Sequence, residues 1–348
     1  MSARLSHRHS GGPWAGLAVA AAFSACGSGA TTPATMTMTT HVDPTWTDMT
    51  LTSAVEIAAG TVVTIAPGAH LTVGAKVPIT VRGTLKVASA AEAHARITAA
   101  DANGQWTGII VENGGTLAAD GLDLDGAETA VDVRAGAAAA RYDHGTITNA
   151  LYAFTVARAG RLDSAHAKVV QPRSTSAISG ELHASYLDYD KAAINGGFVV
   201  SDALAIFDVT DSTLHGTPGA QGADYITTLG ASLLHVAYTT ITDSHCAFHF
   251  DGLDRFEIDH VTTGASTPTG VADKNSWGAM LYGSGAGPSV IKDSNFLNAS
   301  QNLDEQGDNG PITITNTYTT SKNVNEAGVW TLSASESAAA IIPDAMPR

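Results

Sequence analysis

Residues 146–168 read TITNALYAFTVARAGRLDSAHAK, and residues 240–262, TITDSHCAFHFDGLDRFEIDHVT, align with them without a gap. Identical residues recur at matched positions, among them Ile147 and Ile241, Phe154 and Phe248, Arg161 and Arg255, and His166 and His260. Each segment also contains a shorter period of about 20 residues, which is typical of one solenoid repeat. It relates Ile147 to Ala167 in the first segment and Ile241 to Val261 in the second. The chain is therefore predicted to be an array of short repeats.

Extending this period gives a series of positions that we expect to face one shared interior. They are Leu124, Ile147, Ala167, Leu187, Leu214, Ile241, Val261, Phe296 and Tyr318. Several are followed by an alternating apolar pair that alanine precedes, as in AVDV, AFTV and AFHF. Strict alternation over short runs that end in Gly, Asn or Asp predicts short β-strands. No segment beyond the N-terminal region has a helical period.

Short strands, short repeats and no crossover helices favour a stack of coils. Successive coils lie about 4.8 Å apart and share one core, because no coil can bury its apolar face alone. We expect about a dozen coils, a number that follows from a repeat of this length. Asn-Gly hairpin signals between long strands are scarce, which argues against a β-sandwich or a propeller. Residues 41–50, with Trp46, are expected to cap the first coil.

Two stretches carry a family resemblance. IAAGTVVTIAPGAHLTV at residues 57–73 and WTGIIV at 106–111 are similar to the opening coils of secreted right-handed parallel β-helix proteins. The chain resembles this pectate-lyase-like superfamily over residues 50–320. The resemblance implies an all-β fold, a single-stranded right-handed parallel β-helix over 45–324, and a C-terminal cap or tail over 325–348. Functions in such a family are diverse, so the fold does not fix the activity.

The N-terminus is predicted to be a targeting segment. Residues 1–14 are basic, AGLAVAAAF at 15–23 is apolar, and FSAC ends at Cys26. This resembles a bacterial lipoprotein signal over residues 1–25, although Phe23 stands where Leu is usual. The alternative is an ordinary secretory signal with an incidental cysteine. Residues 26–44 are rich in Gly and Thr and are expected to form a flexible tether.

The resemblance implies that Cys26 is lipidated and that the protein is anchored in the cell envelope. Gly27, rather than Asp, follows the cysteine, which implies the outer membrane for a Gram-negative host. The chain has only one other cysteine, Cys246, so no disulfide within the mature chain is expected.

Charge excludes one class of partner. The net charge is −15, from 18 basic and 33 acidic residues. Binding to nucleic acid needs clustered Lys and Arg, which the chain lacks. The oligomeric state is left open.

Residues 240–252, TITDSHCAFHFDG, hold the residue types of a metal site. Alternation places Cys246, Phe248 and Phe250 toward the core and His245, Ala247 and His249 outward. A core cysteine does not share a metal with outward histidines, and no HExxH or paired CxxC occurs, so no metal site is predicted. His245 and His249 are candidate ligand-binding residues near Asp224 and Tyr225. The alternative is an ordinary wet surface.

Stacking is expected to align Lys168, Asp188 and His215 along one face, with His166 and Tyr186 beside them. A polysaccharide lyase needs a base and a cation that neutralises the substrate carboxylate. A glycoside hydrolase needs two carboxyl groups at a set separation. Lys168, Asp188 and His215 are therefore candidate catalytic residues, and His166 and Tyr186 are candidate binding residues. The alternative is a ladder of charges and threonines that stabilises exposed strands.

Two acidic motifs are candidate calcium contacts: Asp123 with Asp125, and Asp304 with Glu305 and Asp308. Neither completes an EF-hand loop, and no cofactor is predicted.

Together these features favour a lipid-anchored cell-envelope protein with a structural, adhesive or glycan-binding role and no catalysis. The alternative is a polysaccharide lyase or glycoside hydrolase that acts on an acidic glycan. The sequence leaves the choice between binding and catalysis open.

Overall fold

The computed structural model describes residues 36–38, 44–88, 93–102, 104–191, 196–216, 223–231, 233–264, 277–282, 287–297, 301–306, 310–319, 322–323 and 330–332. All of them belong to one compact unit that spans residues 34–348. The described residues contain β-strands and no helices, and the paired strands run parallel. The expected all-β class is confirmed.

The strands form three sheets of 13, 13 and 12 strands, here named A, B and C. Sheet A contains β1 (Met36–Met38), β4 (Val55–Ile57), β7 (Pro78–Val81), β10 (Gly108–Val111), β13 (Thr129–Val133), β16 (Tyr152–Val156), β19 (Ser176–Ile178), β22 (Phe198–Ser201), β25 (Ile226–Leu229), β28 (Cys246–Asp251), β31 (Trp277–Tyr282), β34 (Gln301–Gln306) and β37 (Lys322–Asn323). Sheet B contains β2 (Thr45–Trp46), β5 (Val62–Ile65), β8 (Thr84–Ala88), β11 (Thr116–Asp120), β14 (Ala139–Asp143), β17 (Arg161–Ala165), β20 (Glu181–Ser185), β23 (Ile206–Thr210), β26 (Leu233–Ala237), β29 (Arg255–Asp259), β32 (Ser289–Lys292), β35 (Ile312–Thr315) and β38 (Trp330–Leu332). Sheet C contains β3 (Met49–Leu51), β6 (His70–Val73), β9 (Ala95–Ala99), β12 (Leu122–Asp125), β15 (Thr146–Thr148), β18 (Lys168–Val170), β21 (Asp188–Asp190), β24 (Thr213–His215), β27 (Thr240–Thr242), β30 (Thr262–Gly264), β33 (Asn295–Leu297) and β36 (Tyr318–Thr319).

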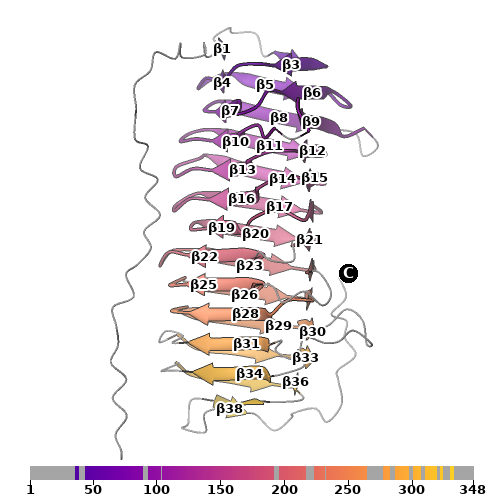
Figure 1. Ribbon diagram of the computed structural model, residues 1–348. Helices are drawn as coiled ribbons and strands as arrows, with labels where there is room; N and C mark the ends of the chain where they lie inside the picture. The colour runs from indigo at the N-terminus through magenta and orange to yellow at the C-terminus, as the bar shows by residue number, and fades with distance from the viewer. Residues whose placement is uncertain are drawn as a thin grey trace, which may run out of the picture. The chain divides into compact units, whose positions relative to one another are not determined.

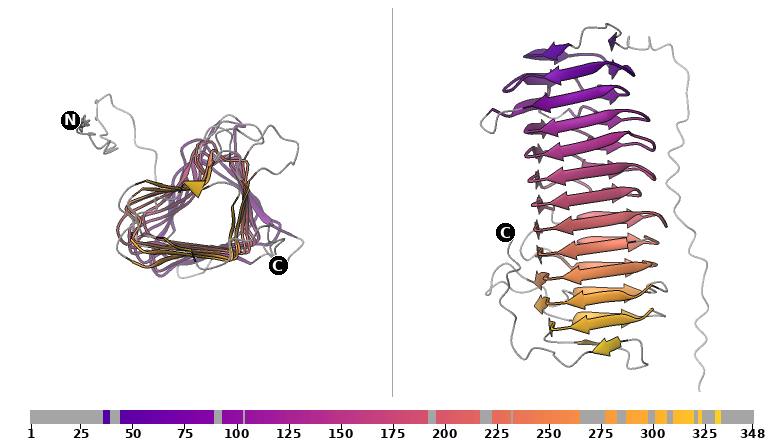
Figure 2. Two further views of the ribbon diagram at one scale, coloured as in Figure 1. Left: turned by 90° about the horizontal axis from the view of Figure 1, so that it is seen from below. Right: turned by 180° about the vertical axis from the view of Figure 1, so that it is seen from behind.

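Each coil contributes one strand to sheet B, then one to sheet C, then one to sheet A (Figure 1). Seen along the stack, the sheets are three walls around one interior (Figure 2). The coils are right-handed, as is usual for connections between parallel strands. The predicted right-handed parallel β-helix is therefore the fold of this unit.

The interior is lined by rows of residues in register along the stack. One row on sheet A is Ile57, Val81, Val111, Val133, Val156, Ile178, Val200, Thr228, Phe250 and Leu281. Every side chain in this row is at most 1% exposed. Burial of such a row supplies the hydrophobic free energy that single coils lack.

The long repeat read from the sequence is confirmed. Ile147 and Ile241 lie in equivalent strands of sheet C, and Phe154 and Phe248 in sheet A. His166 and His260 both follow a strand of sheet B directly, at the corner that leads into sheet C. The two quoted segments are therefore equivalent coils.

Eight of the nine ladder positions are buried as expected, and only Tyr318 is not. The strand register is as expected at Leu124, Ile147, Leu214, Ile241 and Phe296, but it differs at the other four positions. Sheet C pairs Ile147 with Val169, Tyr189 with Leu214, Ile241 with Thr263, and Phe296 with Thr319. The predicted Ala167, Leu187 and Val261 are instead the second residue of the corner before each strand. That residue is also buried, which makes it indistinguishable in sequence from an inward strand residue. Tyr318 is one position early.

The predicted orientation of β28 is right for Cys246, Phe248 and Phe250, which are fully buried. It is wrong for Ala247, which is also fully buried. The corresponding Ala130 and Ala153 are buried in the same way at the start of sheet A strands. The alanine that precedes each apolar pair is thus part of the interior side of the coil.

Trp46 is buried and lies in β2, the end strand of sheet B, so it is part of the first coil; its predicted capping role stays a prediction. Two further short strands, β1 and β38, lie within the segments expected to be tether and tail.

Candidate functional site

Sheets B and C meet at a tight corner of two residues. The first corner residue has a left-handed backbone, with φ between 44° and 54°, at His144, His166, Tyr186, Asp211, Tyr238, His260, Asp293 and Asn316. This conformation is uncommon for residues other than glycine, although Asn, Asp and His adopt it more often than most. The corner therefore presents one polar or aromatic side chain per coil.

Rings at this corner stack on one another. The centroids of His144 and His166 lie 4.8 Å apart, and those of His166 and Tyr186 lie 4.4 Å apart with the rings almost parallel. Both faces of His166 are covered by its neighbours, which leaves only the ring edge for a ligand. Tyr186 is 37% exposed. These two predicted binding residues are therefore brought together, in a stack that stabilises the corner.

The structure also assembles the predicted catalytic candidates on sheet C. Lys168 and Asp188 are in register, and the Lys168 Nζ lies 3.2 Å from Asp188 Oδ2. His215 is in register with Asp190, two residues beyond Asp188, yet its Nε2 reaches Asp188 Oδ1 at 2.7 Å. Both Asp188 oxygens are thus engaged by cationic or hydrogen-bonding partners. The three side chains are 40% to 56% exposed.

On sheet A, His249 meets Asp224 as the sequence predicted. The Nδ1 of His249 lies 2.5 Å from Asp224 Oδ2, and the His249 ring lies 5.2 Å from that of Tyr282. The hydrogen bond to Asp224 raises the pKa of His249, against the opposing effect of burial. Tyr225 is buried in the core rather than beside the histidine. His245 is half-buried.

Sequence reasoning missed a row of ionisable side chains on the outer face of sheet B. Consecutive strands place in register Arg141, Asp163, His183, Asp208, His235 and Glu257. Each is the central outward residue of its strand. The signal in the sequence is an ionisable residue at the third of five strand positions, as in AARYD, RLDSA, ELHAS, IFDVT, LLHVA and RFEID. Recognising it needs the register of sheet B.

Asp208 is the centre of this row. Its Oδ2 lies 3.1 Å from His183 Nδ1, and its Oδ1 lies 2.7 Å from His235 Nδ1. The hydrogen bond from His235 lowers the pKa of Asp208, with a further contribution from His183. The same bond to Asp208 raises the pKa of His235. Asp208 is therefore held as an anion between two imidazoles.

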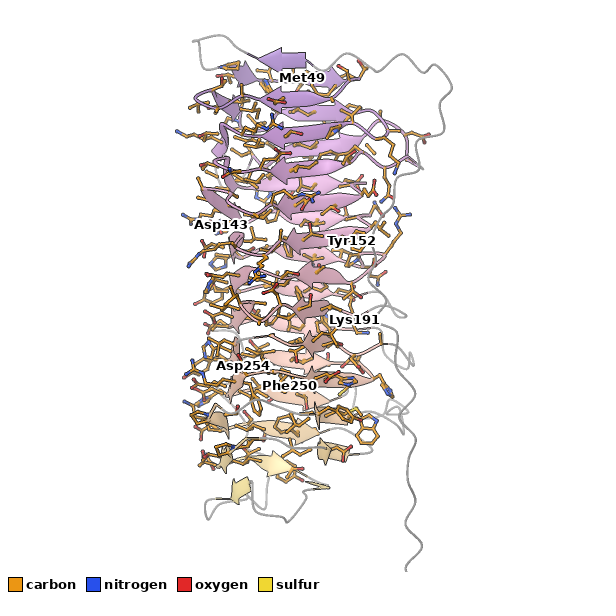
Figure 3. The ribbon with its side chains drawn as sticks, turned by 90° about the vertical axis from the view of Figure 1, so that its left-hand side faces the viewer. Met49, Asp143, Tyr152, Lys191, Phe250 and Asp254 are labelled. Carbon is orange, nitrogen blue, oxygen red and sulfur yellow. The ribbon has the colours of Figure 1, made fainter. Side chains whose placement is uncertain are left out.

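An open pocket of about 310 Å³ lies beside this row. It is lined by residues from four successive strands, β14, β17, β20 and β23: Arg141, Asp143, Asp163, Ser164, Ala165, His183, Ala184, Ser185, Asp208 and Thr210. Figure 3 shows side chains projecting along this edge of the stack, where Asp143 is labelled. Most of the lining groups donate or accept hydrogen bonds.

The acidic pair near the first coils is already engaged by protein donors. Asp123 Oδ1 accepts hydrogen bonds from the Thr146 backbone and contacts His94 Nδ1. Asp125 Oδ1 accepts from Thr148 and Asn149 side chains. At the other acidic motif, Asp304 is buried, Glu305 lies in β34 in register with Leu281, and Asp308 lies outside the described residues. Calcium binding stays an untested prediction.

One buried cation lies between sheets C and A. Lys191 is 1% exposed, and its Nζ lies 5.9 Å from the centre of the Tyr225 ring. Burial lowers the pKa of Lys191, while Asp224 and Asp190 oppose the shift. The side chain is therefore enclosed by the fold rather than presented on an open face.

Comparison of the chain with family models, with curated proteins and with solved structures found no match in any of the three. Among the described residues, no helix is long and apolar enough to cross a membrane.

Proposed function

We propose that this chain is a lipid-anchored envelope protein of the pectate-lyase-like type, whose β-helix binds an extended glycan on sheet B without cleaving it. The observation that carries the proposal is the pocket lined by β14, β17, β20 and β23. Successive coils lie about 4.8 Å apart, so an extended polymer that runs along the stack meets equivalent side chains at each step.

The chemistry of the pocket favours a glycan. Sugar hydroxyl groups both donate and accept hydrogen bonds, and the pocket offers guanidinium, carboxylate, imidazole and hydroxyl groups. Cations and anions alternate along the row, and the whole chain carries a net charge of −15. Such a face has no continuous positive charge for a nucleic acid.

The pairing of the carboxylates supports binding rather than catalysis. A glycoside hydrolase needs one carboxyl group with a raised pKa to protonate the leaving oxygen. The Asp208 pKa is lowered, which is the opposite direction. Asp143 is paired with Arg141, and Asp163 accepts hydrogen bonds from Arg161.

The envelope location rests on the N-terminal sequence, because residues 1–35 lie outside the described residues. Lipidation of Cys26 would tether the stack to a membrane, the outer membrane in a Gram-negative host. We expect Cys26→Ser to release the protein from the membrane fraction of cells that express it. Unchanged partition of this variant would contradict lipidation.

The test of glycan binding is sedimentation of the full chain with a panel of insoluble neutral and acidic polysaccharides. Asp163→Asn and His183→Ala should weaken retention, whereas the matched control Lys168→Ala on sheet C should not. Retention on no polysaccharide, or retention that only Lys168→Ala reduces, contradicts the proposed face.

The alternative is an acidic-glycan lyase or hydrolase, and one observation favours it: Lys168, Asp188 and His215 meet on sheet C. Incubation with uronate-containing glycans, followed by absorbance of unsaturated products and by reducing-end assay, distinguishes the two. Product that His215→Ala abolishes would establish the enzyme in place of the binding protein.

A further inference from the structure

A second chemical site lies at the corner between sheets B and C, toward the C-terminal coils. Among the described residues, one group of three His, Cys, Asp or Glu side chains brings a ligand atom from each within 4.8 Å of the others. Its members are Asp259, His260 and Asp293. Asp259 ends β29 and His260 follows it, while Asp293 is the equivalent corner residue of the next coil.

The geometry points to a binding site for a divalent transition metal, such as Zn²⁺, formed by Asp259, His260 and Asp293. One imidazole nitrogen and two carboxylates suit zinc and its neighbours in the first transition row. Calcium and magnesium prefer a set made of oxygen atoms alone. Three protein ligands leave coordination positions for water.

The groups around these three side chains resemble an outer shell that orients metal ligands. Lys292 Nζ holds Asp259 Oδ2 at 3.1 Å, as an outer-shell partner would. Within the ligand set itself, Asp259 Oδ1 lies 2.6 Å from His260 Nδ1, so a bound metal either displaces this contact or binds the imidazole through Nε2. Asn316 Nδ2 donates to Asp293 Oδ1 at 2.6 Å, so Oδ2 makes no contact with this amide. Partners of this kind fix ligand orientation and tune metal affinity.

The His260 ring is also fixed in place. It stacks on Tyr238 of the preceding coil, with centroids 4.7 Å apart. All three ligand side chains are half-buried, which reduces screening by water without closing access.

Local charge matches a divalent cation. Two carboxylates, those of Asp259 and Asp293, belong to the candidate ligand set, and Lys292 pairs with Glu257 and Asp259 beside it. The negative charge of the two ligand carboxylates is what a divalent ion neutralises.

The position gives the metal a structural role. The step from His260 to Asp293 is longer than any other step between the left-handed corner residues given above. A metal that joins these two corners closes this longest coil, and loop closure stabilises most where the enclosed chain is long. The bound form should therefore unfold at a higher temperature.

The experiment is titration of the full chain with Zn²⁺, followed by calorimetry and by thermal unfolding, with Ca²⁺ and Mg²⁺ in parallel. We expect saturable zinc binding and a raised unfolding temperature. His260→Ala and Asp293→Asn should each weaken zinc binding by at least the roughly 10–100-fold typical of losing an outer-shell partner.

The matched control is His144→Ala. His144 occupies the equivalent corner and contacts Asp120 at 2.8 Å, but the next corner residue is His166 and not a carboxylate. Its loss should leave the His260-dependent binding intact. Asp293→Asn keeps an oxygen acceptor for Asn316, so this variant tests the site even where His260→Ala fails to fold.

Three results would overturn the site. The first is no zinc binding by the wild-type chain, and the second is zinc binding that Asp293→Asn leaves unchanged. The third is an equal loss of zinc binding in His144→Ala, which would indicate that zinc binds to histidines scattered over the surface. Stabilisation by Ca²⁺ but not Zn²⁺ would overturn the metal class. None of these outcomes depends on glycan binding by sheet B.

Discussion

Sheets B and C each hold one carboxylate between two nitrogen-bearing side chains, but they do so differently. On sheet B, Asp208 lies between His183 and His235, which are in register with it on the strands on either side. On sheet C, Asp188 has Lys168 in register, whereas His215 reaches it diagonally. The side chains are 26% to 34% exposed around Asp208 and 40% to 56% exposed around Asp188.

From this difference we infer that coupling along a solenoid face depends on register and on partial burial together. An in-register row keeps each side chain packed between its neighbours, so the pair is less hydrated and interacts more strongly. A diagonal, more exposed pair approaches the behaviour of an ordinary surface salt bridge. Sheet B is therefore expected to respond more to mutation and pH than sheet C.

The largest expected effect lies in the interior beneath the sheet B row. Phe207 is fully buried and packs 5.0 Å from Phe198, measured between ring centroids. Phe207→Ala should lower the free energy of unfolding by about 3–5 kcal/mol, through lost burial and the cavity left behind. Chemical denaturation measures this loss. The exposed Leu204 is the control, since Leu204→Ala should change stability by less than about 0.5 kcal/mol.

The second prediction concerns the charge on Asp208. Asp208→Asn keeps a hydrogen-bond acceptor but removes the anion between the two imidazoles. We expect a loss of about 1 kcal/mol near pH 6, the upper end for an exposed ion pair because the side chains are half-buried. Denaturant midpoints for wild type and variant give the difference. Equal stability would show that burial on this face does not strengthen the pair.

The third prediction is the pH dependence of that pair. The raised pKa of His235 means that its contribution is fully present below about 6.5, its unfolded value, and is lost as pH rises through the folded pKa. The lowered pKa of Asp208 means that its contribution is present above about 3.9 and is lost as pH falls through its folded pKa. The pair should therefore stabilise most between these two values.

His235→Gln isolates this term. The groups that face His235 are Asp208, Glu257 and Asp259, all of which favour the protonated ring. The stability difference between wild type and His235→Gln should shrink as pH rises from about 5 to about 9, above the usual pKa of histidine. A difference that stays constant or grows over this range contradicts the assignment.

The sequence predicted the coil and the long repeat because identical residues such as Phe154 and Phe248 occupy equivalent strands. It placed Ala167 and Leu187 correctly in the interior but assigned them to strands instead of corners, because a buried corner residue and a buried strand residue are both small or apolar. The same register error placed His215 level with Lys168 and Asp188. In the structure Lys168 is level with Asp188, whereas His215 is level with Asp190. The rows of His183, Asp208 and His235 need the register of a sheet that the ladder of sheet C does not fix.

The contacts among Lys168, Asp188 and His215 were nevertheless predicted correctly, although the predicted register of His215 was wrong. Long side chains reach diagonal neighbours, so proximity tolerates a shift that would exchange inward and outward residues in the core. Predictions of surface groups are thus less sensitive to register than predictions of core rows, but they say less about the strength of coupling.

The smallest expected effect tests that last point on sheet C. Asp188→Asn and Lys168→Ala should each change stability by only a few tenths of a kcal/mol, because their side chains are 40% and 56% exposed and the interaction is screened. A double-mutant cycle of the two substitutions, measured by denaturation in low and high salt, gives the coupling energy directly. We expect a coupling well below that of Asp208 with His235 and lower still in high salt. A coupling on sheet C that equals or exceeds the one on sheet B would reverse the comparison. It would make Asp188 and its partners the stronger candidate for a functional centre.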